Sequence, residues 1–469
     1  MDKAIINSHF DGISGNYDHW KSKNYYYYDT LKAHYREYTA DDDAVIEFGC
    51  GTGEVINAVN GRRKLGLDLS DGMVELAREK FSDIEFHQHD CEEPFGEPGQ
   101  FDVAILADVI DHITDILKVY ASVNHSLKIG GRICITTINP LWDPIFWVAE
   151  NLGQKMPEGQ HNFVPNRYLA NFLKLRGFKL VLKGSAFLVP RHIPLISNPL
   201  NRIAPRTPLL NRFCAIQTLI AEKIEDYESP SVPDLSCTVV IPCHNEADNI
   251  ERCIERIPNL GKTTEIIVVD DGSDDDTAEI ANRVAESDDR VRVISYQPNR
   301  GKGQAVKAGF DNATSDIMMI LDADMTVMPE ELPLFVEPFV QGSADMVNGT
   351  RMIYPMEQQS MRFLNLIGNF GFGIILSWLI GYRISDSLCG TKALYRRHYD
   401  GIDIGKDRWG DFELLFGAAE KKLRIVEVPV HYKMRDGGES KMKPFKHGIM
   451  MLGTCWRGFK QLKLRRKNK

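Results

Sequence analysis

Two aspartates separated by one residue are the feature of the sequence that points most directly to chemistry. Asp322 and Asp324 follow the apolar run 317–321, which has the length and composition of a buried strand. Carboxylates at a strand end can bind a divalent cation, because hard cations prefer oxygen ligands. The same cation can bridge the oxygens of a diphosphate. We therefore expect Asp322 and Asp324 to hold a Mg or Mn ion, the alternative being that they cap the next helix.

Three further motifs precede this pair in a fixed order. They are the strand-like run 238–242 with the residues that follow it, the run 265–269 with Asp-Asp-Gly-Ser after it, and the glycine-containing segment 299–305. This set resembles the family 2 glycosyltransferases of the GT-A fold. The resemblance implies that a UDP- or GDP-linked sugar is bound by Pro242, Asn245, Glu246, Asp271, Lys302, Asp322 and Arg351.

Later motifs narrow the resemblance, which covers residues 236–445. The segments 386–392, 408–415, 427–430 and 438–441 look like those of polyprenyl- or dolichyl-phosphate mannosyl- and glucosyltransferases. The resemblance implies an inverting, metal-dependent transfer in which Asp322 and Asp324 act with two basic residues that close over the diphosphate. It also implies one arginine for the lipid phosphate. Those residues are Arg435 and Lys441 for the diphosphate and Arg362 for the lipid phosphate. Thr326 departs from the family, which often has Gln there.

The acceptor of the sugar has two readings. A lipid phosphate is already anionic at neutral pH and needs no strong base, whereas a saccharide hydroxyl would need a carboxylate to take its proton. Asp411 or Glu413 would be that carboxylate. We expect a polyprenyl (dolichyl-type) phosphate, because the basic C-terminal end and the apolar segment 364–382 both suit a membrane substrate.

The first half of the chain contains a different motif, a glycine-rich turn after the short apolar run 44–48. The third glycine of the dinucleotide fingerprint is replaced by Ile56. Two following strand-like runs each end in an acid, and the succession resembles class I methyltransferases over residues 8–222. The resemblance implies that this half binds S-adenosyl-L-methionine. Asp68 would hold its ribose, and Asp90 and Cys91 would face its adenine. The residues for its methionine part would be Glu47, Gly49, Cys50 and Gly51. Capping of the next helix is the alternative for the two aspartates.

The methyl acceptor leaves little trace in the sequence, because this cofactor carries the activated group and the protein mainly orients the reactants. We expect residues 140–222 to form the acceptor cover, and Tyr25–Tyr28 either to close over the cofactor or to pack elsewhere. His112 is a base or a packing residue. A methyltransferase and a non-catalytic S-adenosylmethionine-binding module both remain open.

These motifs need two sheets to position them. Apolar runs alternate with helical stretches over 44–137 and again over 237–324, and 469 residues exceed one compact core. We expect an α/β protein of two domains, each a mostly parallel Rossmann-like sheet flanked by helices. The methyltransferase fold would span 1–225 and the GT-A fold 236–445. An acidic, proline-containing linker, 226–235, joins them, and a basic amphipathic tail, 446–469, follows.

Charge and composition restrict the partners and the location. The net charge is −9, yet residues 421–469 hold 15 Lys or Arg against 3 Asp or Glu. This basic end favours binding to an anionic membrane surface over the alternative of a solvated tail.

We expect the apolar segment 364–382 to be a helix at the membrane interface or against the core. Nine cysteines without a metal-like spacing, and no signal-peptide pattern, favour the cytoplasmic face. No nucleic-acid partner is expected, since residues 1–225 hold 24 basic against 29 acidic residues.

Overall fold

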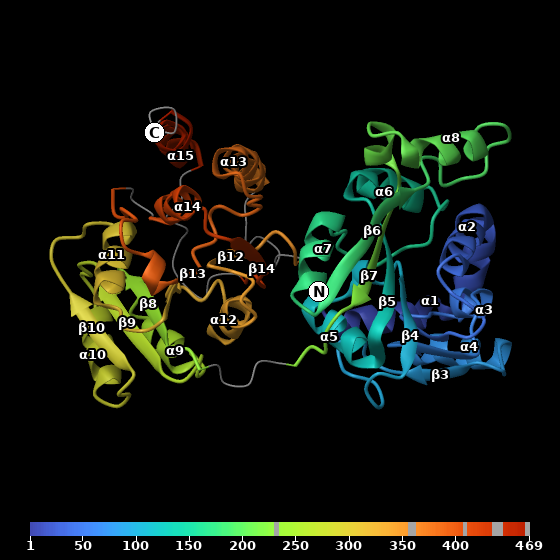
Figure 1. Ribbon diagram of the computed structural model, residues 1–469, viewed down its shortest axis with the longest axis horizontal. Coiled ribbons are helices and arrows are strands. Elements are labelled where there is room, and N and C mark those ends of the chain that lie inside the picture. Colours follow the sequence, from blue (N-terminus) through green and yellow to red (C-terminus); the bar gives the residue numbers. More distant parts are fainter. Residues whose placement is uncertain (229–233, 355–362, 407–409, 434–443, 465–469) are drawn as a thin grey trace. The chain divides into compact units, whose positions relative to one another are not determined.

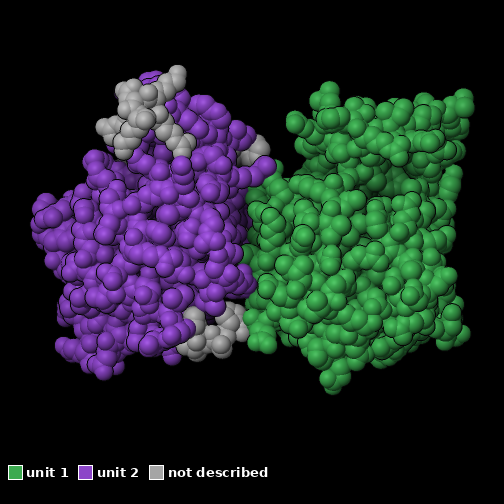
Figure 2. Space-filling view, viewed as in Figure 1, with its two compact units in different colours: residues 1–228 green, residues 229–469 purple. Residues whose placement is uncertain are grey.

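The computed structural model describes residues 1–228, 234–354, 363–406, 410–433 and 444–464. It divides the chain into two compact units, unit 1 (Met1–Glu228) and unit 2 (Ser229–Lys469), shown in Figures 1 and 2. The division falls inside the stretch 226–235. Each unit has its own sheet, so each is described by itself.

Unit 1 is built on a seven-stranded sheet of order β3-β2-β1-β4-β5-β7-β6. The five strands from β3 to β5 are parallel, and β7 runs antiparallel to both of its neighbours. All five residues of β1 are buried, as expected of a parallel strand covered on both faces. The strands are β1 (Ala44–Phe48), β2 (Arg63–Asp68), β3 (Glu85–Gln88), β4 (Phe101–Ala107), β5 (Leu127–Ile138), β6 (Phe178–Ala186) and β7 (Ile216–Lys223).

Eight α-helices surround this sheet. Three of them begin with side-chain capping bonds: Asp2 accepts from the amide of Ala4, Ser70 from the amide of Met73, and Asp115 from the amides of Leu117 and Lys118. The helices are α1 (Lys3–Lys23), α2 (Tyr25–Arg36), α3 (Glu54–Ala58), α4 (Asp71–Lys80), α5 (Ile116–Ser126), α6 (Asp143–Asn151), α7 (Asn166–Lys174) and α8 (Ser197–Ile203). Four short 3₁₀ turns join them, η1 (Ile110–His112), η2 (Pro140–Trp142), η3 (Ala204–Arg206) and η4 (Leu210–Phe213).

The exit of the chain from unit 1 is fixed by Lys223, the last residue of β7. Its buried ammonium donates to the carbonyl oxygens of Asn124 (2.6 Å) and Leu127 (2.7 Å). Asn124 also accepts, through Oδ1, from the amide of Tyr227 at 2.9 Å. Because β7 is antiparallel to β5, the chain leaves at the amino end of β5.

Unit 2 has a second seven-stranded sheet, of order β10-β9-β8-β11-β13-β12-β14. Only β13 is antiparallel to its neighbours. Both sheets are thus mostly parallel, which confirms the predicted fold class. The strands are β8 (Cys237–Cys243), β9 (Thr264–Asp270), β10 (Val291–Ser295), β11 (Ile317–Ile320), β12 (Met346–Thr350), β13 (Lys392–Tyr395) and β14 (Ile425–Pro429).

Four of the seven described α-helices of unit 2 share one large core with its sheet. The apolar segment near residue 370 forms α13, whose Leu376, Leu379 and Ile380 are buried in that core, as expected of a helix packed against it. Among the described residues, no helix is long and apolar enough to cross a membrane. The helices are α9 (Ile250–Glu255), α10 (Thr277–Ala285), α11 (Lys302–Asn312), α12 (Pro333–Val340), α13 (Phe363–Ile380), α14 (Asp411–Glu420) and α15 (Pro444–Phe459).

Candidate active sites

The glycine-rich turn after β1 is held against the end of β2. The amides of Gly49 and Cys50 donate to the carbonyl oxygen of Leu67 at 2.7 and 2.9 Å. Gly49 has a φ of 73°, and a Cβ there would lie 2.2 Å from Cγ2 of Val109. Glycine is therefore required at this position both by the backbone and by the close approach of the segment after β4.

Two carboxylates stand at the ends of the next strands. Asp68 accepts from the amides of Gly51 (2.7 Å) and Ser70 (3.0 Å), and burial raises the pKa of its carboxyl. Asp90 accepts from Nζ of Lys3 at 2.6 Å. Burial opposes the ionisation of Asp90, but the hydrogen bond from Lys3 holds its pKa below the ordinary value.

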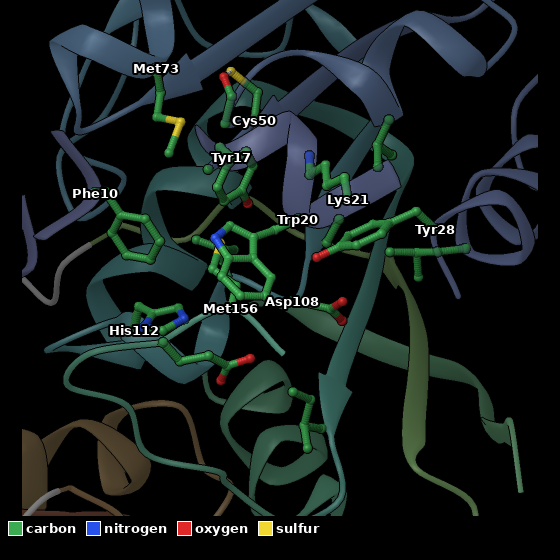
Figure 3. A pocket seen from close by; sticks show the side chains of 18 of the residues that line it. Phe10, Tyr17, Trp20, Lys21, Tyr28, Cys50, Met73, Asp108, His112 and Met156 are labelled. Carbon is green, nitrogen blue, oxygen red and sulfur yellow. Dashed lines mark hydrogen bonds between the residues drawn. The ribbon is translucent and has the colours of Figure 1, made fainter. Parts of the chain in front are cut away.

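These groups surround a cavity of about 340 Å³, drawn in Figure 3. Its lining combines carboxylates with backbone left open by glycines, which suits a ligand with positive charge and hydroxyl groups. The residues present therefore fit S-adenosylmethionine, which carries a sulfonium, an ammonium and a ribose. All seven residues predicted for this cofactor line the cavity, namely Glu47, Gly49, Cys50, Gly51, Asp68, Asp90 and Cys91.

Asp108 is a residue of this cavity that the sequence analysis did not single out. It follows β4 with a φ of 56° and accepts from Oη of Tyr27 (2.5 Å) and Oγ1 of Thr136 (2.7 Å). Burial raises the pKa of Asp108. Asp108 thus places a carboxylate on the cavity wall, with each oxygen oriented by one hydroxyl group. Positive φ at a non-glycine residue is not readable from sequence.

Lys21 of α1 brings a cation into the same cavity. Its Nζ lies 4.5 Å from the ring centroid of Tyr17 and 5.3 Å from that of Tyr28. Burial lowers the pKa of Lys21, and burial raises the pKa of Glu47 to about 8 although the two groups attract each other. Tyr17 and Lys21 lie one turn apart on α1, but Tyr28 belongs to α2, so no single helical spacing in the sequence marks this contact.

The expected acceptor cover and tyrosine run are only partly correct. Tyr27 and Tyr28 line the cavity, whereas Tyr25 is exposed and Tyr26 donates to Asn198. Within 140–222, strands β6 and β7 belong to the sheet, so the expectation that the whole stretch is a cover was wrong. Its contributions to the cavity come from residues 142–158 and 190–191.

His112 lies in the wall of the cavity, and its ring is tied to the backbone. Its Nδ1 is 3.0 Å from the carbonyl oxygen of Gln160, and its ring meets that of Phe10 edge-on at 5.0 Å. Burial lowers the pKa of His112, which favours the neutral imidazole. The contact with Gln160 occupies Nδ1, as in a histidine that serves packing.

In unit 2, the loops after β8 and β9 are joined through Asn245. The amide of Asn245 donates to Oγ of Ser273 at 2.9 Å, and its Oδ1 accepts from the amide of Asp274 at 2.9 Å. Beside it, the amide of Glu246 donates to Oγ1 of Thr277 at 2.9 Å. Pro242 is the last residue but one of β8. Since β8 and β9 are parallel, these predicted nucleotide-binding residues meet at one edge of the sheet.

Asp271 organises the glycine-containing loop that leads into α11. Its two carboxylate oxygens accept from the amides of Arg300 and Gly301, each at 2.7 Å. Asp271 is buried, and the side chain of Asn299 donates back to its carbonyl oxygen at 2.9 Å. This carboxylate therefore fixes the loop that presents Lys302.

The two aspartates after β11 differ in their partners. Asp322 forms an ion pair with Nζ of Lys302 at 2.6 Å, and Asp324 accepts from Oγ1 of Thr326 at 2.8 Å. Burial alone would raise the pKa of Asp322, but Lys302, Lys392 and Arg351 together hold it below its ordinary value. Thr326 thus orients the carboxylate of Asp324.

Gly390 lies close against the carboxylate of Asp322. A Cβ on Gly390 would lie 2.1 Å from Oδ2 of Asp322, so a larger residue there would displace this carboxylate. In the described part of the chain, no three His, Cys, Asp or Glu side chains gather as a metal site. The carboxylates of Asp322 and Asp324 are oxygen ligands of the kind that Mg or Mn prefers.

Arg351 is held by a buried carboxylate behind this edge. Its Nε and an Nη donate to the two oxygens of Asp386 at 2.6 and 2.9 Å, and its guanidinium lies 4.8 Å from the ring centroid of Tyr432. Nearby, Glu427 accepts from Oγ of Ser385 at 2.6 Å, and burial raises its pKa to about 7. The bidentate pair gives Arg351 a fixed orientation.

Other predicted residues are not part of this arrangement. Glu413 accepts through Oε2 from the amides of Gly405 (2.6 Å) and Lys406 (3.2 Å), so this oxygen anchors the loop at 405–406. The side chain of Asp411 is outside the described residues. Arg362, Arg435 and Lys441 also lie outside the described residues.

Comparison with known proteins gives a family for each unit. Residues 238–401 match the family described as Glycosyl transferase family 2, and residues 19–183 match one described as Methyltransferase domain. The chain is 31% identical over 217 residues to the dolichol-phosphate mannosyltransferase of Pyrococcus furiosus, which covers 45% of this chain and 60% of that protein. It is 30% identical over 218 residues to the polyprenol monophosphomannose synthase of Mycolicibacterium smegmatis, which covers 45% of this chain and 82% of that protein.

Among solved structures, one similar chain is a SAM-dependent methyltransferase, possible histamine N-methyltransferase, from Thermotoga maritima. It has 17% identity and a TM-score of 0.37, and the match covers 46% of this chain and 99% of that one. The chain therefore belongs to the family 2 glycosyltransferases through a domain that resembles dolichyl- and polyprenyl-phosphate glycosyltransferases, and a methyltransferase domain precedes it.

Proposed function

We propose that unit 2 moves a sugar from a UDP- or GDP-linked donor to a polyprenyl phosphate, with inversion at the anomeric carbon. The observation that carries this proposal is the ion pair of Lys302 with Asp322 beside Asp324, at the edge where the loops after β8 and β9 also meet. The similarity to enzymes named for dolichol and polyprenol phosphates supports the acceptor class.

In this mechanism the residues of unit 2 stabilise the departing nucleotide diphosphate. Asp322 and Asp324 would hold a Mg or Mn ion, which supplies Lewis-acid stabilisation of the leaving group. Lys302 would add a fixed positive charge at the same edge, and such preorganised charge is most effective where negative charge develops. We propose the same role for Arg435 and Lys441, and phosphate binding for Arg362. The anionic oxygen of the acceptor attacks without a strong base.

A saccharide hydroxyl as the acceptor is the second candidate. It needs a carboxylate free to take a proton, and Glu413 instead binds the backbone of the loop at 405–406. The side chain of Asp411, the other candidate base, lies outside the described residues. A phosphate acceptor brings its own negative charge and needs no such base.

The helical end of unit 2 carries a surface that suits a membrane. Trp378 of α13 and Trp456 of α15 are 60% and 57% exposed, and the ring of Phe459 stacks near both at 5.8 and 5.5 Å. The ammonium groups of Lys460 and Lys463 lie over the two indoles, each 5.5 Å from a centroid. Exposed tryptophans beside lysines are typical of the headgroup region of a bilayer. We propose peripheral binding of this face at the cytoplasmic membrane surface.

For unit 1 we propose methyl transfer from S-adenosylmethionine to a component of the same glycan or glycolipid pathway. When bound, this cofactor supplies an activated methyl group. Glu47, Asp68 and Asp90 would hold it, and Asp108 would take a proton from the acceptor. A carboxylate oriented by Tyr27 on the cavity wall favours a catalytic unit over a module that only binds the cofactor.

One experiment tests the glycosyl half directly. The full chain is incubated with labelled UDP- and GDP-sugars, Mg or Mn, and polyprenyl phosphate, and the lipid is then extracted. Label in the organic phase that is lost in Asp324→Ala would support the proposal. Label found only on soluble saccharide would overturn the phosphate acceptor. A parallel binding assay with S-adenosylmethionine should show loss of binding in Asp68→Ala, and unchanged binding would contradict the proposed ribose contact.

A further inference from the structure

Two segments of unit 1 form one layer at the end of that unit where α6 and α8 lie (Figure 1). We name this layer, residues 140–152 and 189–213, the cap. The side-chain amide of Asn139 donates to the carbonyl oxygens of Arg212 (3.0 Å) and Cys214 (2.9 Å), which joins the two segments at their base. Tyr26 of α2 donates to Asn198 of α8 at 2.9 Å. The cap is thus fixed to the rest of unit 1.

The cap contains most of the large apolar side chains that unit 1 exposes. Eleven of the seventeen large apolar side chains that unit 1 exposes belong to it, including Leu195 (95% exposed), Leu152 (68%) and Trp147 (65%). Helix α6 buries none of its residues although it exposes Ile145, Trp147 and Val148. Such a concentration of exposed apolar side chains marks an interaction surface on a folded domain.

The charges of the cap indicate the kind of partner. Its four arginines, Arg191, Arg202, Arg206 and Arg212, are all exposed among the apolar side chains. The acids of the cap are Asp143 and Glu150 of α6, and its segment 189–213 holds the four arginines and no Asp or Glu. Apolar side chains with arginines between them match a bilayer that contains anionic lipids, because the former enter the acyl boundary and the latter stay at the headgroups.

The cap is also part of the wall of the cavity in unit 1. Ile145 and Phe146 of α6, together with Pro190 and Arg191, line that cavity. Ile145 is exposed as well, so the cavity wall is continuous with the outer surface of the cap. A substrate held in a membrane against the cap would therefore meet the cavity at Ile145 and Arg191.

We infer that the cap docks unit 1 on an anionic lipid bilayer and that the methyl acceptor is a lipid-linked molecule entering the cavity past Ile145 and Arg191. The membrane docking is argued only from the residues of the cap. The acceptor class, in contrast, rests on the methyl transfer proposed above for unit 1. This surface belongs to unit 1, whereas the tryptophan and lysine face belongs to unit 2.

The buried cysteines allow a direct test in the full chain. All nine native thiols are buried, so Leu195→Cys creates an exposed thiol for an environment-sensitive maleimide fluorophore. The matched control is Ile129→Cys, also exposed, nine residues before Ile138 on β5 and so roughly 30 Å from the cavity end of that strand. Vesicles of phosphatidylcholine with phosphatidylglycerol should shift the emission of the label at 195 to the blue and leave the label at 129 unchanged.

Three results would overturn the docking. The first is no emission shift of the label at 195 with these vesicles, and the second is an equal shift of both labels. The third is a shift at 195 that needs no vesicles and grows with protein concentration, which would make a second copy of the chain the partner.

Sedimentation with vesicles measures membrane binding independently of the label. It uses a Trp378→Ser, Trp456→Ser background, which removes the proposed membrane face of unit 2. There, Trp147→Asp with Leu195→Asp should abolish vesicle binding, and Ile129→Asp should not.

The acceptor class has its own readout. Methyl label from S-adenosylmethionine should enter the organic phase of a lipid extract, and the Trp147→Asp, Leu195→Asp variant should lose that label while it still binds the cofactor. Label that enters only water-soluble acceptors, with docking intact, would refute the lipid-linked acceptor. Absence of any methyl transfer, with docking intact, would instead refute the proposed function of unit 1.

Discussion

Nζ of Lys302 lies 2.6 Å from Oδ1 of Asp322, so the first residue of α11 and the segment after β11 meet in an ion pair. Asp271 fixes the two residues just before Lys302 through the amides of Arg300 and Gly301. One buried carboxylate therefore positions the lysine, and a second carboxylate receives it. The lysine also holds the pKa of Asp322 low, which keeps the carboxylate ionised for a cation.

Replacement of this lysine should abolish most of the sugar transfer. Lys302→Met removes the fixed positive charge at the diphosphate edge, and loss of one such preorganised group typically costs about 100-fold or more in rate. The matched control is Lys307→Met on the same helix, which removes an exposed ion pair with Asp311. Initial rates of sugar transfer measure both variants. Equal rates for the two would contradict the role of Lys302.

An alanine at position 49 should abolish S-adenosylmethionine binding. Gly49→Ala adds the strain of a positive φ, about 1 kcal/mol, and also a clash with Val109. Gly130→Ala has the same backbone strain, with a φ of 82°, and no neighbour within 4 Å. Calorimetric titration should detect binding in the second variant alone. Val109→Ala should partly restore binding to Gly49→Ala, and a lack of any rescue would count against the steric explanation.

Asp108→Asn should slow methyl transfer by about 100-fold or more while S-adenosylmethionine still binds, since an amide cannot take a proton. Tyr27→Phe should have a smaller effect, because it removes only one of the two orienting hydroxyls. Burial raises the pKa of Asp108, so the wild-type rate should rise with pH through a range above the ordinary value of an aspartate. A pH profile that is unchanged in Asp108→Asn would exclude this carboxylate as the base.

The buried Glu427 should make unit 2 less stable as the pH rises. Its pKa is about 7 in the folded protein against 4.5 as the ordinary value, so between these values the folded state binds more protons than the unfolded state. The free energy of unfolding then falls with rising pH, by at most about 3 kcal/mol over this interval. Glu427→Gln should lack this contribution. Urea unfolding of both proteins at several pH values measures the difference, and a difference that does not change with pH would contradict the assignment.

Much of both sites could be predicted because parallel strands bring their carboxyl ends to one edge. Asp68 and Asp90 were predicted from strand ends, and the structure places both on the cavity. Asp108 also follows a strand, but its role depends on Tyr27, which is 81 residues away in sequence. Contacts of that kind come from packing and leave no local pattern. The same holds for Lys21, whose place in the cavity depends on its contacts with the rings of Tyr17 and Tyr28.

The ends of the strands also show how the two units can share one chain. Unit 1 ends at the amino end of β5, where Lys223 is bonded, and its cavity lies at the other end of that strand. Unit 2 begins with β8, whose first residue is at the amino end and whose last residues lead into the nucleotide loops. The covalent junction therefore runs between the two sheet edges that lie opposite the candidate sites. Changes in the length or composition of this junction should consequently leave both candidate sites intact.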